Sequence, residues 1–468
     1  MKIFNLWLVL ILFSSFVQAA EMAGKVGYMS GTLIAQRGAG TVQVLGPKSD
    51  VLAGDMLVTG NDSYAQIQMN DGAKITLRPN SNLKIESFNF TQEKPEADNV
   101  VFSLLKGGFR ALSGLIGKRG NADAYKLHAA NSTIGIRGTD FSTRLCASRD
   151  CQDEESDKKK TAVAIPVAAS QVIGRVMLVN GELSAKDKSG RVRKLLLGGP
   201  LYEGDELMTG SKSTAVVAFR DEGRISLQEN TVFQVEKFKY NKAAAEENAV
   251  LRLFKGGVRV ITGLIGHINH DNYQFHVANS TIGIRGTGFD TWCNGPCASG
   301  AAHPGATEGS PLDGEGVYVW SGEVALVTDC DAAQSGGACP TQIVGLNQAA
   351  IIARDTDKPV PVKVVPQSIL NNAAPRPDSV PLDMNKLFGA TPATSDPGVY
   401  VTVHDGQVIL SQRDQSLDLG RGETGFAGAA ALVRLAAPPS FMGGDMQINS
   451  QGGQPNTPGI GAGGCAVQ

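Results

Sequence analysis

The sequence predicts an all-β protein made of two duplicated domains, and three observations carry this prediction. The ten residues ANSTIGIRGT occur twice, at 130–139 and at 278–287, an offset of 278 − 130 = 148 residues. Shorter motifs recur at nearly the same offset, such as Gly-Asp at 54–55 and at 204–205. Short runs of alternating apolar and polar residues, separated by turn residues, fill both copies. Ten identical residues in two places indicate duplication rather than shared composition.

The alternating runs predict many short strands, arranged as a sandwich or in a solenoid-like stack. One hairpin is predicted by the alternating run 65–69, the Asn-Asp-Gly turn at 70–72 and the run 74–77. The repeated decapeptide is typical of a strand that enters a tight turn. Its isoleucines and threonines favour an extended backbone, and its glycines permit close approach or a positive φ.

Changes in composition divide the chain into segments. A run of acidic and then basic residues after the first copy is typical of a solvated linker, and proline- and glycine-rich stretches follow the second copy. The predicted segments are a signal peptide at 1–19, a first β-domain at 24–151, a charged linker at 152–169, a second β-domain at 170–355, an extended proline-rich linker at 356–396 and a disordered tail at 438–468.

A strand pair that closes the second copy has a twin far along the chain. Gly-Val-Tyr-Val with a following Gly-x-Val-x-Leu begins at 316 and again at 398, an offset of 398 − 316 = 82 residues. The first copy has no such unit after its cysteines, and an isolated strand pair would expose an apolar face. We therefore expect residues 396–430 to complete the first domain, which makes the second domain an insertion. The alternatives are that this unit packs beside the second domain or forms a third module.

The N-terminus has the pattern of a secretory signal peptide. Lys2 precedes an apolar run from Ile3 to Phe16, and small residues lead to an expected cleavage site after Ala19. An uncleaved anchor is the alternative, although the apolar run is short for a membrane span. We expect an exported protein, periplasmic or secreted to the outer surface, with no transmembrane span in the mature chain.

Six of the seven cysteines form close-spaced couples, which favours disulfides in an oxidising compartment. The expected pairs are Cys146–Cys151, Cys293–Cys297 and Cys330–Cys339. A zinc site is the alternative, but its usual Cys-x2-Cys spacing is missing from the sequence. Cys465 is left over and receives no role.

The repeated decapeptide also supplies the candidate ligand-binding residues. Arg137 and its twin Arg285 are its only charged residues, and a guanidinium suits an anionic ligand. The alternative is a structural arginine, exposed or paired with a carboxylate, for which Asp55 and Asp205 are the first expected partners. The sequence contains no recognisable catalytic constellation, so we expect no enzyme activity, no cofactor and no metal. A net charge of −2 argues against a nucleic-acid partner.

Together these motifs resemble the FecR-like domain family. The resemblance rests on G-D-x-x-x-T-G, D-G before a strand, L-x-K-G-G, T-I-G-I-R-G-T-x-F, a local cysteine couple and the closing strand pair, and it spans residues 24–430. It implies an exported pair of all-β domains, and the lack of a catalytic constellation predicts that they act as a non-catalytic binding, sensing or protein-interaction module. The implied partner is an envelope protein or a small periplasmic ligand. The alternative functions are an enzyme acting on envelope glycans and a structural surface or matrix protein.

Overall fold

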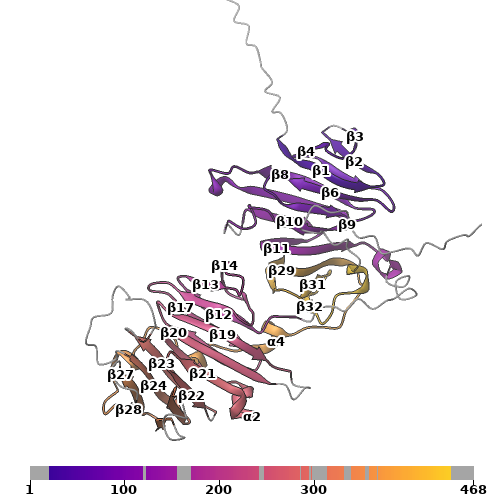
Figure 1. Ribbon diagram of the computed structural model, residues 1–468. Helices are drawn as coiled ribbons and strands as arrows, with labels where there is room; N and C mark the ends of the chain where they lie inside the picture. The colour runs from indigo at the N-terminus through magenta and orange to yellow at the C-terminus, as the bar shows by residue number, and fades with distance from the viewer. Residues whose placement is uncertain are drawn as a thin grey trace, which may run out of the picture.

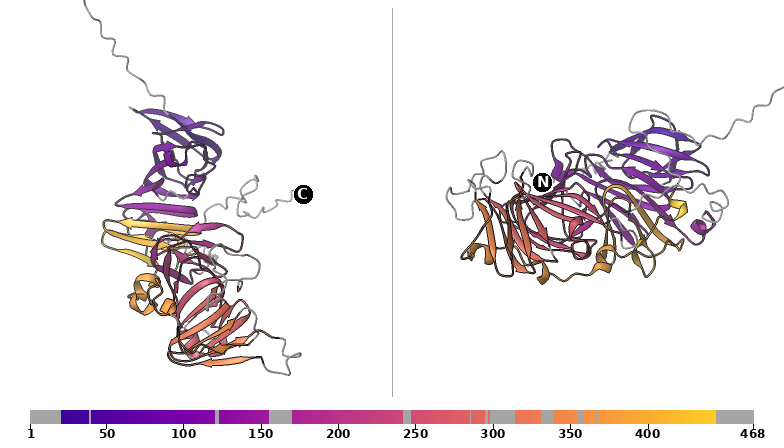
Figure 2. Two further views of the ribbon diagram at one scale, coloured as in Figure 1. Left: turned by 90° about the vertical axis from the view of Figure 1, so that its left-hand side faces the viewer. Right: turned by 60° about the horizontal axis from the view of Figure 1, so that its bottom comes forward.

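The computed structural model describes residues 21–443, apart from 39, 120–122, 155–169, 242–246, 285, 295–296, 298–313, 331–338, 354–357 and 366. Most of the described chain is β-strand, in two domains that lie end to end (Figure 1). Two further views in Figure 2 show the same elongated arrangement. The predicted all-β, two-domain architecture is confirmed. The predicted signal peptide, Arg285, most of the charged linker and Cys465 lie outside the described residues.

The first domain is a sandwich of two β-layers. Its strands are β1 (Met22–Ser30), β2 (Leu33–Arg37), β3 (Thr41–Leu45), β4 (Asp50–Leu52), β5 (Met56–Thr59), β6 (Tyr64–Met69), β7 (Lys74–Leu77), β8 (Asn82–Asn89), β9 (Asn99–Leu112), β10 (Tyr125–Ala129), β11 (Ser132–Cys146), β29 (Gly398–Gln412), β30 (Gln415–Leu419), β31 (Thr424–Ala427) and β32 (Leu432–Leu435), with one 3-10 turn, η1 (Pro95–Ala97). One layer has the order β4-β1-β6-β7-β9-β11-β29-β31-β32 and the other β3-β2-β5-β8-β9-β10-β11-β29-β30. The long strands β9, β11 and β29 belong to both layers, and one apolar core lies between them.

The second domain repeats this plan. It contains β12 (Gly174–Asn180), β13 (Leu183–Lys186), β14 (Val192–Lys194), β15 (Pro200–Leu201), β16 (Glu206–Thr209), β17 (Thr214–Phe219), β18 (Arg224–Leu227), β19 (Val232–Lys239), β20 (Asn248–Ile261), β21 (Tyr273–Val277), β22 (Ser280–Ile284), β23 (Gly288–Asn294), β24 (Gly314–Ser321), β25 (Val324–Thr328), β26 (Thr341–Val344), β27 (Ala349–Ala353) and β28 (Val360–Pro361), with α2 (Leu264–Ile268) and η2 (His270–Asn272). Its layers are β15-β12-β17-β18-β20-β23-β24-β27-β28 and β14-β13-β16-β19-β20-β21-β22-β25-β26. Each step along the chain thus adds a strand to one layer or the other.

The C-terminal strand pair completes the first domain, as the sequence predicted. β29 pairs antiparallel with β11 along both layers, so that Val399 lies opposite Leu145 and Val408 opposite Ile136. Figure 1 shows β29, β31 and β32 beside β11, although 252 residues separate Cys146 from Gly398 (398 − 146). The second domain is therefore inserted within the first.

The strand register corrects the predicted offset between the two closing units. Cys293 pairs with Glu315, and the equivalent Leu145 pairs with Val399, so the true offset is 399 − 315 = 84 residues. The identical Gly-Val-Tyr-Val strings are out of register by two residues. The bends set the register, because Gly322 and its twin 84 residues later, Gly406, both have positive φ, 77° and 83°.

These bends bring the strand ends together. β11 and β29 cross between the layers at Gly138 and Gly406, where a side chain on Gly406 would meet the Gly138 carbonyl oxygen at 2.3 Å. One half of β11 lies in each layer, and the same is true of β29. The ends of these two strands therefore meet on the side of the sandwich opposite the bends. They are Ser132, Cys146, Gly398 and Gln412. That side is called the open side below.

The linker expected to be extended is packed, and so are the first residues of the segment expected to be disordered; residues 444–468 of that segment lie outside the described part of the chain. The proline-rich linker contains α3 (Gln367–Leu370), η4 (Pro377–Ser379) and α4 (Met384–Phe388), and it covers the outer face of the second domain. There Ile369 packs with Trp292 and Tyr318, and the Ala374 carbonyl accepts from Arg259 at 3.0 Å. The predicted tail begins with η5 (Ser440–Met442), which is buried against Tyr400. The sequence did not predict this packing because single apolar residues make the contacts, and they follow no helical or strand period.

The two domains meet through a buried ion cluster. The Glu423 carboxylate pairs with Arg434 of its own domain at 3.2 Å and with Arg175 of the second domain, and the side chains of Glu423 and Arg175 are each 1% exposed. Burial alone would raise the pKa of Glu423, but the two guanidinium groups outweigh it and the pKa is lowered. Nearby, Tyr202 of the second domain donates to the Gly406 carbonyl at 3.2 Å. The junction thus joins the closing strands of one domain to the first strands of the other.

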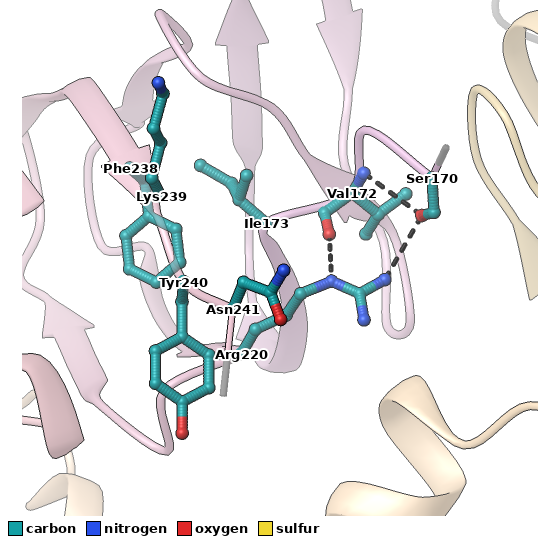
Figure 3. Close-up of a pocket in the computed structure, with 8 residues that line it drawn as sticks. All are labelled: Ser170, Val172, Ile173, Arg220, Phe238, Lys239, Tyr240 and Asn241. Atoms are coloured by element: carbon teal, nitrogen blue, oxygen red, sulfur yellow. Dashed lines mark hydrogen bonds between the residues drawn. The ribbon is translucent and has the colours of Figure 1, made fainter. Parts of the chain in front are cut away.

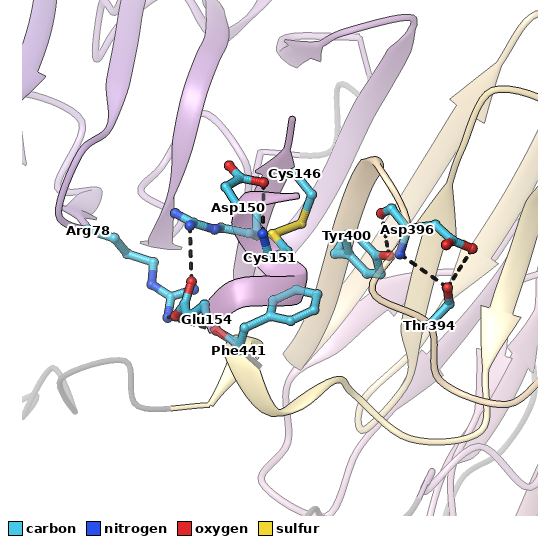
Figure 4. The surroundings of a disulfide bond; sticks show 10 residues. Arg78, Cys146, Asp150, Cys151, Glu154, Thr394, Asp396, Tyr400 and Phe441 are labelled. Carbon is cyan, nitrogen blue, oxygen red and sulfur yellow. Dashed lines mark hydrogen bonds and ion pairs between the residues drawn. A yellow bond between two sulfur atoms is a disulfide. The ribbon is translucent and has the colours of Figure 1, made fainter. Parts of the chain in front are cut away.

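The cysteine couples have the separations that disulfides need. Their Cα–Cα distances are 5.6, 5.4 and 5.6 Å for Cys146–Cys151, Cys293–Cys297 and Cys330–Cys339. The first couple packs with Tyr400 and Phe441 beneath the returning C-terminal segment (Figure 4). Beside it, Arg78 donates to the Phe441 carbonyl oxygen at 2.8 Å. The first couple therefore stabilises the site where the chain returns.

A buried aspartate makes the stability of the second domain depend on pH. Burial raises the pKa of Asp221 to about 6, although the backbone N–H groups of Gly223 and Ile265 oppose that rise. The folded domain thus holds this proton more tightly than the unfolded chain, so this contribution to stability falls as pH rises from about 4 to about 6. Relative to Asp221→Asn, we expect the unaltered protein to lose about 3 kcal/mol of unfolding free energy between pH 4 and pH 7.

Paired denaturation curves of the two proteins at several pH values test this expectation. The measured quantity is the change with pH of the difference in unfolding free energy between the two proteins. The other titrating groups contribute equally to both proteins, and the effect of the introduced amide side chain itself does not depend on pH. A difference that does not change between pH 4 and pH 7 would contradict it.

Candidate functional site

The repeated decapeptide has a structural task at nearly every position. Ala130 and Ala278 form the hairpin turn with positive φ, 47° and 32°. Thr139 accepts from the Arg137 N–H at 3.1 Å and donates to the Gln407 carbonyl at 2.8 Å, which fixes the bend between layers. The N–H of its twin, Thr287, donates to the Thr262 hydroxyl at 2.9 Å. The duplication thus preserves a turn, a strand and a bend.

Arg137 lies on β11, half-buried. Burial lowers the pKa of its guanidinium, while the negative charges of Asp418 and Asp123 oppose that change. Its Nε is buried and has no hydrogen-bond partner among the residues that the structure describes. A structural role and a ligand contact therefore both remain predictions for Arg137, and its twin Arg285 lies outside the described residues.

The expected pairing of Arg137 with Asp55 was wrong, and the pairing expected for Arg285 lies outside the described residues. The Asp55 carboxylate is held by Arg37, with Nε–Oδ1 2.8 Å and Nη2–Oδ2 3.1 Å. Asp205 is held in the same bidentate way by Arg193. Both aspartates cap the turn before their strand, but Arg37 lies on β2 whereas Arg193 lies on β14. The two domains bind equivalent aspartates with arginines from non-equivalent strands. A search at a fixed sequence offset could therefore not identify these arginines.

A cavity of about 560 Å³ lies on the open side of the first domain. The strand ends line it, together with Leu104, Leu105 and His128 from β9 and β10 and the loop 427–429. His128 is exposed, and its Nδ1 lies 3.1 Å from the Thr133 hydroxyl. The lining combines apolar side chains with serine, asparagine, glutamine and histidine, and it contains no carboxylate.

A second cavity, of about 310 Å³, lies in the second domain near the junction. Figure 3 shows Arg220 at its wall, bonded to the Val172 carbonyl and to Ser170 (3.1 Å), with Tyr240 on the opposite side. Arg220 also lies 3.8 Å from the Glu423 carboxylate and stacks on Phe388. Because its guanidinium is engaged by the junction, we assign this cavity a structural role.

Two strong charge pairs join neighbouring strands, one in each domain. Arg110 pairs with Asp140 at 2.8 Å across β9 and β11, and Arg259 pairs with Asp290 at 3.1 Å across β20 and β23. These are cross-strand pairs within one layer. No helix among the described residues is both long enough and apolar enough to span a membrane.

The fold and the cavity define a duplicated, all-β protein in which one domain is nested within the other. The family model described as FecR protein matches residues 55–164 and 205–304, one region in each domain. The chain therefore contains two FecR-like domains, as the sequence resemblance predicted, and FecR-like proteins have sensing and regulatory roles. The closing strands β29–β32 lie outside both matched regions.

Two further comparisons add little to this assignment. A search of curated proteins finds no match to this chain. A crystal structure of a proposed anti-sigma factor from Parabacteroides distasonis is similar at 12% identity, with a TM-score of 0.22, over 34% of this chain and 58% of that one. This chain therefore spans less than two thirds of that protein.

Proposed function

We propose that this chain is an exported, non-catalytic binding or sensing protein of the periplasm or the outer surface. The observation that carries the proposal is the cavity on the open side of the first domain. It offers apolar walls and hydrogen-bonding groups, so its lining suits holding a partner or ligand. The cysteine couples at disulfide separation are consistent with an oxidising compartment.

Site-specific photo-crosslinking in the native envelope tests this proposal. A crosslinking residue at Leu105, which lies in the cavity wall and is 53% exposed, should yield an adduct in the envelope fraction. The matched control is Leu115, which is 42% exposed and lies near the Gly138 bend on the other side of the same domain. Equal labelling at both positions, or protein found only in the cytoplasm, would contradict the proposal.

A further inference from the structure

The two domains differ in how their open sides are closed. In the second domain Glu315 on β24 reaches across to the other layer. Its carboxylate accepts hydrogen bonds from the Asn279 N–H at 2.9 Å and from the Ser280 hydroxyl at 2.5 Å. Burial raises the pKa of this carboxyl, and both bonds oppose that rise. Glu315 therefore joins the two layers where the strand ends meet.

The first domain keeps the donors but lacks the carboxylate. Val399 takes the place of Glu315 in the strand register. Ser132, the twin of Ser280, is 4% exposed, and its Oγ has no hydrogen-bond partner in the described parts of the chain. A buried hydroxyl without a partner is destabilising and uncommon in folded proteins. The cavity on the open side lies at this position, with Asn131 and Ser132 in its lining.

The charge at this position also differs between the domains. In the second domain Asp329 follows β25 and accepts from the Thr281 hydroxyl at 3.2 Å. At the same step after β29 the first domain has Arg413, whose guanidinium donates to the Ala429 carbonyl at 3.3 Å, and Ala429 lines the cavity. The first domain thus lacks two carboxylates that the second domain has here, and it gains a guanidinium.

We infer that the cavity of the first domain binds an organic carboxylate with an apolar body. The ligand carboxylate takes the place that Glu315 holds in the second domain, accepting from the Ser132 hydroxyl and the Asn131 N–H. Arg413, which donates to the carbonyl of Ala429 in the cavity wall, stabilises its negative charge, and Leu105 contacts its apolar part. The inference rests on the proposed binding function and names its ligand class. A free organic acid and the C-terminal carboxylate of a peptide share this chemistry.

Calorimetric titration of the full chain distinguishes these two sources. One arm compares 4-phenylbutyrate with 4-phenylbutyramide. The other compares a tetrapeptide of alanine and leucine with its C-terminal amide. In at least one arm the carboxylate form should bind saturably and about tenfold or more tightly than its neutral partner, because hydrogen bonds to a charged group are stronger. The arm with the tighter binding identifies the source.

Three variants locate the binding. Ser132→Ala should weaken carboxylate binding about tenfold without lowering thermal stability, because the hydroxyl has no partner to lose. Ser280→Ala in the second domain is the matched control and should leave the affinity unchanged. Val399→Glu supplies the missing carboxylate and should abolish binding.

The inference is overturned if neither carboxylate binds better than its amide, or if Ser132→Ala binds as tightly as the unaltered protein. Ser132→Ala removes only a hydroxyl, so it keeps the test decisive even if Val399→Glu does not fold. A specific envelope adduct at Leu105, together with failed carboxylate binding, would leave the proposed function standing and reject only the ligand class.

Discussion

A chain that ends at Ala390 is expected to lose the folded first domain and to keep the second. The truncation removes β29–β32, and β29 is the neighbour of β11 in both layers. It also removes core side chains of the first domain, namely Val399, Val401, Val403, Val408, Leu410 and Leu419. Without them β11 would present an unpaired edge and the core an open apolar face. The second domain keeps its own closing strands, β24–β27.

Hydrogen exchange measures this outcome strand by strand. Amide protection should disappear from β1–β11 and persist in β12–β27. A chain that ends at Gly443 is the control, since it retains every residue that the structure describes. Retained protection in β9–β11 of the shorter chain would show that the first domain does not need the returning strands.

Glu423→Ala is expected to cost about 3–5 kcal/mol of stability, because it leaves two guanidinium groups buried without their carboxylate. Arg175 and Arg434 are 1% and 5% exposed, so water cannot replace the lost partner. The loss falls on the junction and on the closing strands of the first domain. Chemical denaturation of the purified protein measures it.

Asp405→Ala is the matched control at the same junction. Asp405 also pairs with two arginines, Arg191 at 2.8 Å and Arg421 at 3.2 Å, but its side chain is 35% exposed. Solvent screening limits the worth of such pairs to below about 1 kcal/mol. Similar losses for the two variants would mean that burial does not set the strength of this junction.

The duplication and the nesting could be predicted from the sequence because both leave repeated patterns. Identical decapeptides mark the two copies, and the incomplete first copy offers a place for a strand pair that has no neighbour in its own part of the chain. The offset of that pair was wrong, since the prediction matched four identical letters rather than the bend glycines Gly322 and Gly406. With the bends aligned, the exchange of Glu315 for Val399 is readable in the sequence.

Contacts made by single side chains could not be predicted. Arg37, which binds Asp55, lies on β2, whereas Arg193, which binds Asp205, lies on β14, the equivalent of β3. Only the strand register shows that both arginines reach equivalent carboxylates. The proline-rich segment packs on the second domain through Ile369 and Ala374, which follow no helical or strand period. The proposed binding site depends on the Ser132 hydroxyl, which has no hydrogen-bond partner among the described residues. Only the packed structure shows this.

The nested connectivity also determines the order in which the chain can fold. During synthesis β1–β11 emerge first, yet their last neighbour, β29, follows 252 residues after the end of β11 (398 − 146). The second domain is contiguous and can fold as soon as it is complete. Once folded, it brings the two ends of the first domain closer and shortens the flexible loop that must still close, which lowers the entropic cost of closure. The domain that the chain begins is therefore the last one to become native, and until then its unpaired edge needs protection from other chains.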